Sequence, residues 1–344
     1  MTTETMLKRI QRYDGPRLNI MEVCGTHTAA IVHSGLRSLL PENIRLVSGP
    51  GCPVCVTEPG YIDALAEVSM RPNHCVFAFG DMLRVPGSNL SLNGAKAAGG
   101  RVHMFHAPHQ VLAYAKEHPD ETCVVAAIGF ETTAPVYALM LMEAEKAGLT
   151  NIKLISALKT MIPPLHFLAG ESGGIDAFLC PGHVSALIGY AAYEPLAEKY
   201  QKPFVVAGFE GTDILIALAE ILDQLEAGKP KAANTYERAV TRDGNKLAMD
   251  AVMHYFEPSD ASWRGIGLIP SSGLRLKPEH ERFSAWPGEI PAGEKPAACR
   301  CGDVMLGRIL PPECPLYGKA CDPAHPVGPC MVSAEGACGI FLRG

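Results

Sequence analysis

The chain has 344 residues, of which 47% are hydrophobic and 19% charged, and its formal net charge is −6. This composition is typical of a globular protein large enough for two or three domains. The negative charge and the lack of a basic run argue against nucleic acid as the main partner. The N-terminus lacks a signal-peptide pattern, and no apolar run reaches the roughly 18 residues of a membrane span, so we expect a cytoplasmic protein.

After a short helix expected within residues 1–17, short apolar runs alternate with helical patterns along the chain. The runs expected to form strands are 18–23, 44–48, 75–79, 102–105, 123–129, 152–157, 176–180 and 203–208. Strands that alternate with helices are typical of parallel sheets. Beyond them, we expect helices over 214–226 and 232–256 and an irregular segment from Pro258 onward.

These patterns predict an α/β fold with two adjacent parallel-sheet domains and a small cysteine-rich C-terminal domain. The expected boundaries are 1–120 for the first domain, 121–230 for the second and 231–344 for the third. The first of these would contain Cys24 and the pair Cys52 and Cys55.

The pair Cys52 and Cys55 lies in the stretch Gly-Pro-Gly-Cys-Pro-Val-Cys at 49–55. The glycines and prolines prevent the preceding strand from continuing, so the pair should lie on a rigid turn at the carboxyl end of a strand. Open α/β sheets bind their ligands at that end. Two such thiols can form a disulfide, lower one another's pKa or bind a soft metal, and a purely structural pair is the plainer alternative.

Cys24 follows another expected strand, in the stretch Met-Glu-Val-Cys-Gly-Thr-His-Thr at 21–28. A helix is expected to begin next to it, and the helix dipole would favour the thiolate form of Cys24. His27, three residues further on, could be a base, a metal ligand or a hydrogen-bond donor, or simply a satisfied polar residue.

Other strand ends carry weaker signals. Gly-Phe-Glu occurs at 129–131 and again at 208–210, each time after an expected strand, which makes Glu131 a candidate functional residue. His183 also follows a strand and could face the same cleft as Cys24. Neither a dinucleotide-binding glycine motif nor a Walker-type motif occurs, so a nucleotide site of these kinds is not supported.

The C-terminal region contains half of the chain's twelve cysteines. They are Cys299, Cys301, Cys314, Cys321, Cys330 and Cys338. In a reducing compartment such crowding indicates metal or redox chemistry. Four thiolates can carry a [4Fe–4S] cluster, and the two additional thiols suggest a redox pair next to it. Zinc held by four cysteines is the structural alternative, although the loose spacing is unusual for zinc.

Together these motifs resemble one family over essentially the whole chain. The stretches 21–28, 49–55, 129–135 and 181–185 and the cysteine-rich tail are similar to those of the HypD family of hydrogenase maturation proteins. The resemblance implies two α/β domains and a C-terminal domain with a [4Fe–4S] cluster. It also implies that the protein, with a small partner called HypC, is the scaffold on which the Fe(CN)2CO group of [NiFe]-hydrogenase is assembled. HypE would deliver the cyanide as a thiocyanate.

The resemblance also assigns roles to single residues. Cys24 matches the cysteine that binds the iron together with a cysteine of HypC, and His27 matches the histidine beside the iron. Cys52 and Cys55 match the thiol pair of the cleft. Thiolate is a soft ligand that suits iron carrying cyanide and carbonyl, and a dithiol coupled to a cluster can supply reducing equivalents for cyanide transfer.

The tail resembles ferredoxin–thioredoxin reductase, in which a cluster lies next to a redox disulfide. Partly from this resemblance and partly from spacing, we expect the cluster ligands to be Cys299, Cys314, Cys321 and Cys338. Cys301 and Cys330 would form the redox pair, because Cys330 lies on a loop that is free to approach Cys301. The choices between Cys299 and Cys301 and between Cys330 and Cys338 stay open.

Two other functions are compatible with the sequence. One is an iron–sulfur thiol–disulfide oxidoreductase that uses Cys52 and Cys55 on protein substrates. The other is a zinc-stabilised binding protein without a redox role. Iron and sulfide content separates the zinc protein from the others, and infrared bands of cyanide and carbonyl separate the scaffold from the oxidoreductase.

Overall fold

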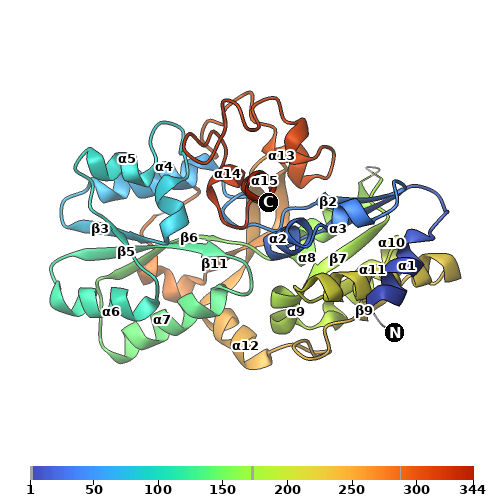
Figure 1. Cartoon of the computed structure of the whole chain (residues 1–344). Helices are drawn as coiled ribbons and strands as arrows, with labels where there is room; N and C mark the ends of the chain where they lie inside the picture. Colours follow the sequence, from blue (N-terminus) through green and yellow to red (C-terminus); the bar gives the residue numbers. More distant parts are fainter. Residues whose placement is uncertain (1–2, 172–173, 287) are drawn as a thin grey trace.

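The computed structural model describes residues 3–171, 174–286 and 288–344, and it contains two parallel sheets next to each other (Figure 1). The five-stranded sheet has the order β2-β1-β7-β8-β9, and the four-stranded sheet has the order β4-β3-β5-β6. Most strand residues are buried, as expected of parallel strands covered by helices on both faces. The predicted α/β class with two parallel sheets and a cysteine-rich C-terminal region is confirmed.

The five-stranded sheet combines strands from the beginning and the middle of the chain. Its strands are β1 (Leu18–Glu22), β2 (Ile44–Ser48), β7 (Ala177–Pro181), β8 (Phe204–Ala207) and β9 (Ala232–Asn234). Its helices are α1 (Thr3–Gln11), α2 (Gly25–His33), α3 (Leu36–Leu39), α9 (Gly182–Ile188), α10 (Glu194–Tyr200) and α11 (Gly211–Ala227). Phe178 and Phe204 are register partners on β7 and β8, and their rings stack at 4.6 Å in the core.

The four-stranded sheet is formed by the chain between β2 and β7. Its strands are β3 (His74–Ala78), β4 (Val102–Met104), β5 (Thr122–Gly129) and β6 (Ile152–Leu158). Its helices are α4 (Pro59–Ser69), α5 (Leu92–Ala97), α6 (Pro108–Glu117) and α7 (Ala134–Lys146), with the 3-10 turn η1 (Gly80–Arg84) after β3. Cys75 and Cys123 are register partners on β3 and β5 and are fully buried, as core cysteines should be.

The remaining elements connect the sheets and form the tail. They are α8 (Ile162–Gly170), η2 (Tyr190–Tyr193), α12 (Lys246–Tyr255), β10 (Phe256–Trp263), β11 (Gly267–Leu276), η3 (Pro278–Phe283), α13 (Cys301–Met305), η4 (Pro311–Glu313), α14 (Pro329–Val332) and α15 (Ala337–Arg343). Strands β10 and β11 form an antiparallel hairpin. The tail lies over the junction of the two sheets (Figure 1).

All eight strands expected from the sequence are present, but the region after α11 was predicted wrongly. The expected helix over 232–256 begins only at Lys246, because β9 and a loop precede it. The segment from Pro258, expected to be irregular, is largely the β10–β11 hairpin. The many polar residues of the partly exposed strand β10 leave no apolar run, so the hairpin was not predicted.

The expected domain boundaries do not coincide with the sheets. The boundary at residue 120 falls inside the four-stranded sheet, between β4 and β5. The boundary at residue 230 separates β9 from the sheet to which it belongs. The physical reason is that β1 pairs with both β2 and β7, so the four-stranded sheet is an insertion between two parts of the other sheet. Such non-local pairing leaves no local signal in the sequence.

The strand order of each sheet reverses at one place. In the five-stranded sheet this place lies between β1 and β7, and in the four-stranded sheet between β3 and β5. Parallel sheets bind ligands outside the carboxyl ends of the strands at such positions. Cys24 lies two residues after the end of β1, so the topology places it at the expected ligand position. No helix in the described residues has the length and apolarity to cross a membrane.

Candidate functional site

Cys24 lies between β1 and α2, with extended backbone angles of φ −154° and ψ 125°. Its N–H donates to the buried Glu22 carboxylate at 3.1 Å, and Thr28 Oγ1 donates to the other oxygen of that carboxylate. Cys24 is 8% exposed, and burial raises the pKa of its thiol to about 12. The expectation of a thiolate is therefore wrong for the free protein, because desolvation outweighs the effect of the helix dipole.

His27 is fully buried in the first turn of α2. Its Nε2 lies 3.2 Å from the carbonyl oxygen of Ala207 at the end of β8. A carbonyl can only accept, so Nε2 carries the proton and Nδ1 is left with a lone pair. Nδ1 is buried and has no hydrogen-bond partner within the described residues. Burial lowers the pKa of His27 to about 4, so the neutral ring can offer Nδ1 to a metal or a donor.

Cys52 and Cys55 are joined by a disulfide on the loop after β2, with their Cα atoms 5.2 Å apart. Gly51 brings this loop against Cys24, because a Cβ on Gly51 would lie 2.2 Å from the Cys24 nitrogen and 2.4 Å from its Cα. Gly25 N also donates to Gly51 O at 3.3 Å. The free thiol and the disulfide thus lie on two loops in direct backbone contact.

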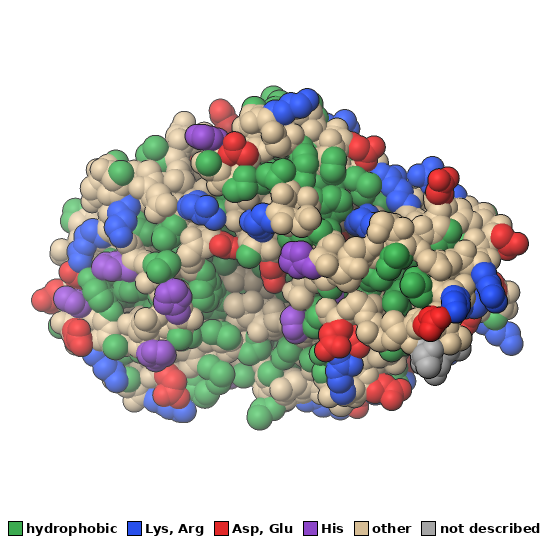
Figure 2. Space-filling view, viewed as in Figure 1, with side chains coloured by type: hydrophobic (Ala, Val, Ile, Leu, Met, Phe, Trp, Pro, Cys, Tyr) green, Lys and Arg blue, Asp and Glu red, His purple; other side chains and the backbone are tan. Residues whose placement is uncertain are grey.

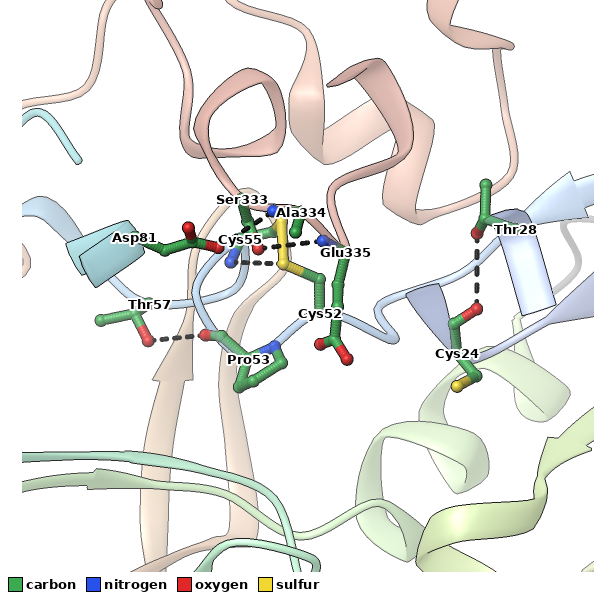
Figure 3. Close-up of a disulfide and its surroundings, with 10 residues drawn as sticks. All are labelled: Cys24, Thr28, Cys52, Pro53, Cys55, Thr57, Asp81, Ser333, Ala334 and Glu335. Carbon is green, nitrogen blue, oxygen red and sulfur yellow. Dashed lines mark hydrogen bonds between the residues drawn. A yellow bond between two sulfur atoms is a disulfide. The ribbon is translucent and has the colours of Figure 1, made fainter. Parts of the chain in front are cut away.

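The C-terminal tail reaches this site through the loop 333–336 (Figure 3). A Cβ on Gly25 would lie 2.3 Å from the carbonyl oxygen of Glu335, so the loop packs against the start of α2. On the other side, Ala334 N donates to Asp81 Oδ2 at 2.9 Å. Asp81 follows β3, so one loop contacts the ligand-binding ends of both sheets.

Glu335 adds a carboxylate to the site. In Figure 3 its side chain extends into the space between Cys52 and Cys24. Glu335 is exposed, yet desolvation by the residues around it raises the pKa of its carboxyl, and its charge in turn contributes to the raised pKa of Cys24. The charge of Glu335 therefore acts on the Cys24 thiol.

The two weaker candidates also lie at strand ends near this region. The exposed His183 ring stacks on Phe209 at 3.9 Å, and the same Phe209 lies 5.0 Å from the His27 ring. Glu131 Oε1 accepts from Met161 N at 2.8 Å, while Oε2 is buried without a partner in the described structure. Burial raises the pKa of Glu131 to about 7.

All six tail cysteines line one cavity. They are Cys299, Cys301, Cys314, Cys321, Cys330 and Cys338. Apolar residues such as Val304, Leu316 and Met331 complete its walls. Cys301 has hydrogen-bond contact with the thiols of Cys299 and Cys330, and these contacts hold the pKa of Cys301 well below its usual value. Cys330 also contacts Cys338.

Six thiols around one apolar cavity are a donor set that fits a [4Fe–4S] cluster, which takes four thiolates. Within the described ranges, no three His, Cys, Asp or Glu side chains are already close enough to hold a single metal ion. Cys301 and Cys330 lie in contact, but so do Cys299 and Cys301, and Cys330 and Cys338. The structure therefore brings the six together without selecting the four ligands.

Three residues of the site were not singled out from the sequence: Glu22, Asp81 and Glu335. Glu22 is the last residue of β1, and Asp81 comes shortly after β3, so their position at strand ends was an available signal. Glu335 had no such signal, because the path of the tail loop depends on its packing against residues far away in the chain.

Figure 2 shows a hollow between the two halves of the molecule, with histidine and acidic side chains along its edge.

Fold and site together define a class: a two-sheet α/β protein in which a buried thiol and a disulfide are linked to a cysteine-lined cavity. The HypD family model, described as "Hydrogenase formation hypA family", matches residues 1–343. The hydrogenase maturation factor HypD of Escherichia coli K12 is 43% identical over 332 residues, which cover 95% of this chain and 89% of that protein.

Two further relatives agree with this match. The hydrogenase maturation factor HypD of Rhodobacter capsulatus is 40% identical over 335 residues, covering 95% of this chain and 89% of that protein. A putative hydrogenase expression/formation protein of Methanocaldococcus jannaschii is 40% identical over 330 residues, covering 95% of this chain and 92% of that protein. The chain belongs to the HypD family of hydrogenase maturation factors.

Proposed function

We propose that this protein is the scaffold on which the Fe(CN)2CO group of [NiFe]-hydrogenase is assembled, with HypC as the partner that shares the iron and HypE as the cyanide donor. Cys24 binds the iron, which is cargo and not a resident cofactor. His27 lies beside it with the Nδ1 lone pair. The disulfide of Cys52 and Cys55 supplies the redox chemistry.

The observation that carries this proposal is the link between the two groups of thiols. Cys330 lines the tail cavity, and the loop 333–336 follows it within a few residues. That loop packs against Gly25, next to Cys24, and Gly51 holds the disulfide loop against Cys24. A short path of contacts therefore joins the cysteine cavity to the iron site and the disulfide.

In the tail, we assign Cys299, Cys314, Cys321 and Cys338 to a [4Fe–4S] cluster and Cys301 with Cys330 to the neighbouring redox pair. A bound cluster would supply electrons one at a time. Reduction of the Cys52–Cys55 disulfide takes two electrons and two protons and gives two thiols. Re-oxidation of this dithiol to the disulfide would release the two electrons and two protons again, and it is the redox contribution of the chain to cyanide transfer.

Iron loading at Cys24 requires loss of the thiol proton. Burial raises the pKa of Cys24 to about 12, so the free protein holds the protonated thiol. Metal binding deprotonates a coordinating thiol and releases its proton, since the thiolate is the ligand form. The buried thiol is thereby protected from oxidation until the iron arrives.

The competing function is a thiol–disulfide oxidoreductase that acts on protein substrates. Such an enzyme needs a sulfur atom that a protein thiol can reach. Cys52 is 5% exposed and Cys55 is 1% exposed, and the tail loop covers the same region. Burial of the disulfide argues for an internal reaction on bound cargo over exchange with protein substrates.

Complementation of a strain that lacks its own HypD protein tests the proposed function. Cys24→Ala should abolish [NiFe]-hydrogenase activity at an unchanged level of soluble protein. Cys52→Ser and Cys55→Ser should each abolish it as well, because a dithiol needs both members. The matched control is Cys180→Ala, which changes a buried cysteine of β7 and should retain activity. Normal maturation in Cys24→Ala would exclude its role as iron ligand, and normal maturation in either Ser variant would reduce the pair to a structural role.

A further inference from the structure

A second cavity lies on the outer side of the cysteine region, between the turn of the β10–β11 hairpin and the start of α13. Its volume is about 190 Å³. Its charged lining residues are Arg264, Lys295, Arg300 and Asp303, and Cys299 and Cys301 form part of its wall. Three of the four charged side chains are cationic.

Arg264 is the residue that makes this cavity unusual. It is 1% exposed, and its Nη1 is buried without a hydrogen-bond partner in the described structure. Its backbone N–H donates to Val56 O at 2.8 Å, so the donor without an acceptor is Nη1 of the side chain. Guanidinium is always charged and offers five donors, and a buried donor without an acceptor is costly.

Each nearby carboxylate has a partner, but Oε2 of Glu58 is buried and has none within the described residues. Asp303 accepts from Arg300 Nε at 2.8 Å and lies 3.8 Å from Arg308. Glu58 Oε1 accepts from Lys295 Nζ at 2.9 Å and from Ser262 Oγ at 2.8 Å.

Lys295 stands at the rim of the cavity with its side chain 39% exposed. Its ammonium group has three donors, of which Glu58 takes one. The cavity therefore has a buried guanidinium at its wall and an ammonium with spare donors at its opening.

We propose that this cavity binds a small oxyanion, of the carboxylate or phosphate type, between Arg264 and Lys295. A planar guanidinium matches two oxygens of such an anion with parallel hydrogen bonds, and the ammonium adds a point charge. The volume admits a free small molecule with bridging water. The cavity lining contains neither Cys24 nor the disulfide cysteines, although Arg264 N–H bonds to Val56 next to Cys55. The proposal does not depend on the proposed function.

Isothermal titration of inorganic phosphate and of acetate into the full-length protein, purified anaerobically, tests the proposal at fixed ionic strength with chloride as the reference anion. We expect binding of at least one of the two anions with one site per chain. Arg264→Gln should weaken it at least tenfold and Arg264→Lys less, because the charge remains but the two-point geometry is lost. Lys295→Gln should weaken it several-fold. Arg308→Gln, which changes an arginine outside the cavity lining, should leave it unchanged.

If Arg264→Gln does not fold, the comparison of Lys295→Gln with Arg308→Gln decides the matter. Equal affinity in these two variants, or no binding of either anion at millimolar concentration, would overturn the proposal. Binding of a glutamate-rich peptide without binding of free phosphate or acetate would also overturn it, in favour of a protein-borne carboxylate. If no anion binds but Arg264→Gln shifts the reduction potential of a cluster in the cysteine cavity, the Arg264 guanidinium acts on that cluster. This result would overturn the proposed anion site. These experiments measure anion binding and a reduction potential, whereas the proposed function is tested by hydrogenase maturation. The two proposals can therefore fail separately.

Discussion

At the scale of single residues, burial decides the chemistry of this site. A helix N-terminus stabilises a nearby anion by about 0.3–1 kcal/mol, up to about 2 kcal/mol in favourable geometry. Cys24 sits at such a position, and yet its pKa is raised to about 12 because desolvation is the larger effect. The same effect lowers the pKa of His27 to about 4. The sequence correctly placed Cys24 after a strand and His27 near the start of a helix, but it could not give their burial.

Glu131 provides a pH-dependent test of this burial. Its pKa is raised from 4.5 to about 7 by burial, so the folded state prefers the protonated carboxyl. The stability it contributes is fully present below about pH 4.5 and is lost as the pH rises through about 7, by up to about 3 kcal/mol. Glu131→Gln should therefore show a smaller fall in Tm between about pH 5 and about pH 8 than the unchanged protein.

The matched control for this measurement is Glu117→Gln, which neutralises an exposed carboxyl at the end of α6. It should keep the pH slope of the unchanged protein. An identical slope in Glu131→Gln would show that the Glu131 carboxyl does not titrate in this range.

The tail cysteines provide a second test at this scale. Single Ser variants of the four assigned ligands, Cys299, Cys314, Cys321 and Cys338, should lose iron and sulfide. Cys301→Ser and Cys330→Ser should keep the cluster, because they remove only the redox pair. Iron and sulfide analysis with the charge-transfer absorbance of each purified variant makes the comparison. Loss of the cluster in Cys301→Ser or Cys330→Ser, with retention in Cys299→Ser, would reverse the assignment.

At the scale of elements, the sequence predicted what local patterns determine. Continuous apolar runs identified all eight central strands, and β2 has its expected bounds. The same runs carry no information on which strands pair, so the joining of β1 with β7 was missed. Strand β9 has three half-buried residues, too few for a recognisable period. The convergence of the tail loop on Gly25 and Asp81 also depends on contacts between distant segments.

The contact between the two site loops can be tested at Gly51. Gly51→Ala adds a Cβ that would lie 2.2 Å from the Cys24 backbone nitrogen, so one loop must move. Overpacking of this kind costs about 1–3 kcal/mol, which should appear as a lower Tm and as loss of maturation. Gly80→Ala is the control, since its new Cβ would meet only the flexible Met104 side chain at 3.3 Å. An unchanged Tm and full maturation in Gly51→Ala would show that the loops are not held in this contact.

At the scale of the whole molecule, the two sheets and the tail form one site from distant parts of the chain. The five-stranded sheet provides Cys24, and the loop after β2 provides the disulfide. The tail provides the cysteine cavity, and its loop 333–336 bridges the ends of both sheets. This arrangement predicts that the proposed iron site at Cys24 and the cysteine cavity are chemically distinct and can be lost separately.

Infrared spectroscopy of the protein purified anaerobically with the proposed partner HypC tests the central claim most directly. The unchanged protein should show stretching bands of cyanide and carbonyl bound to iron. Cys24→Ala should lose these bands while it keeps the iron, the sulfide and the absorbance of the tail cluster. Bands that persist in Cys24→Ala, or that are absent from the unchanged protein, would contradict the assignment of this chain as the assembly scaffold with Cys24 as its iron ligand.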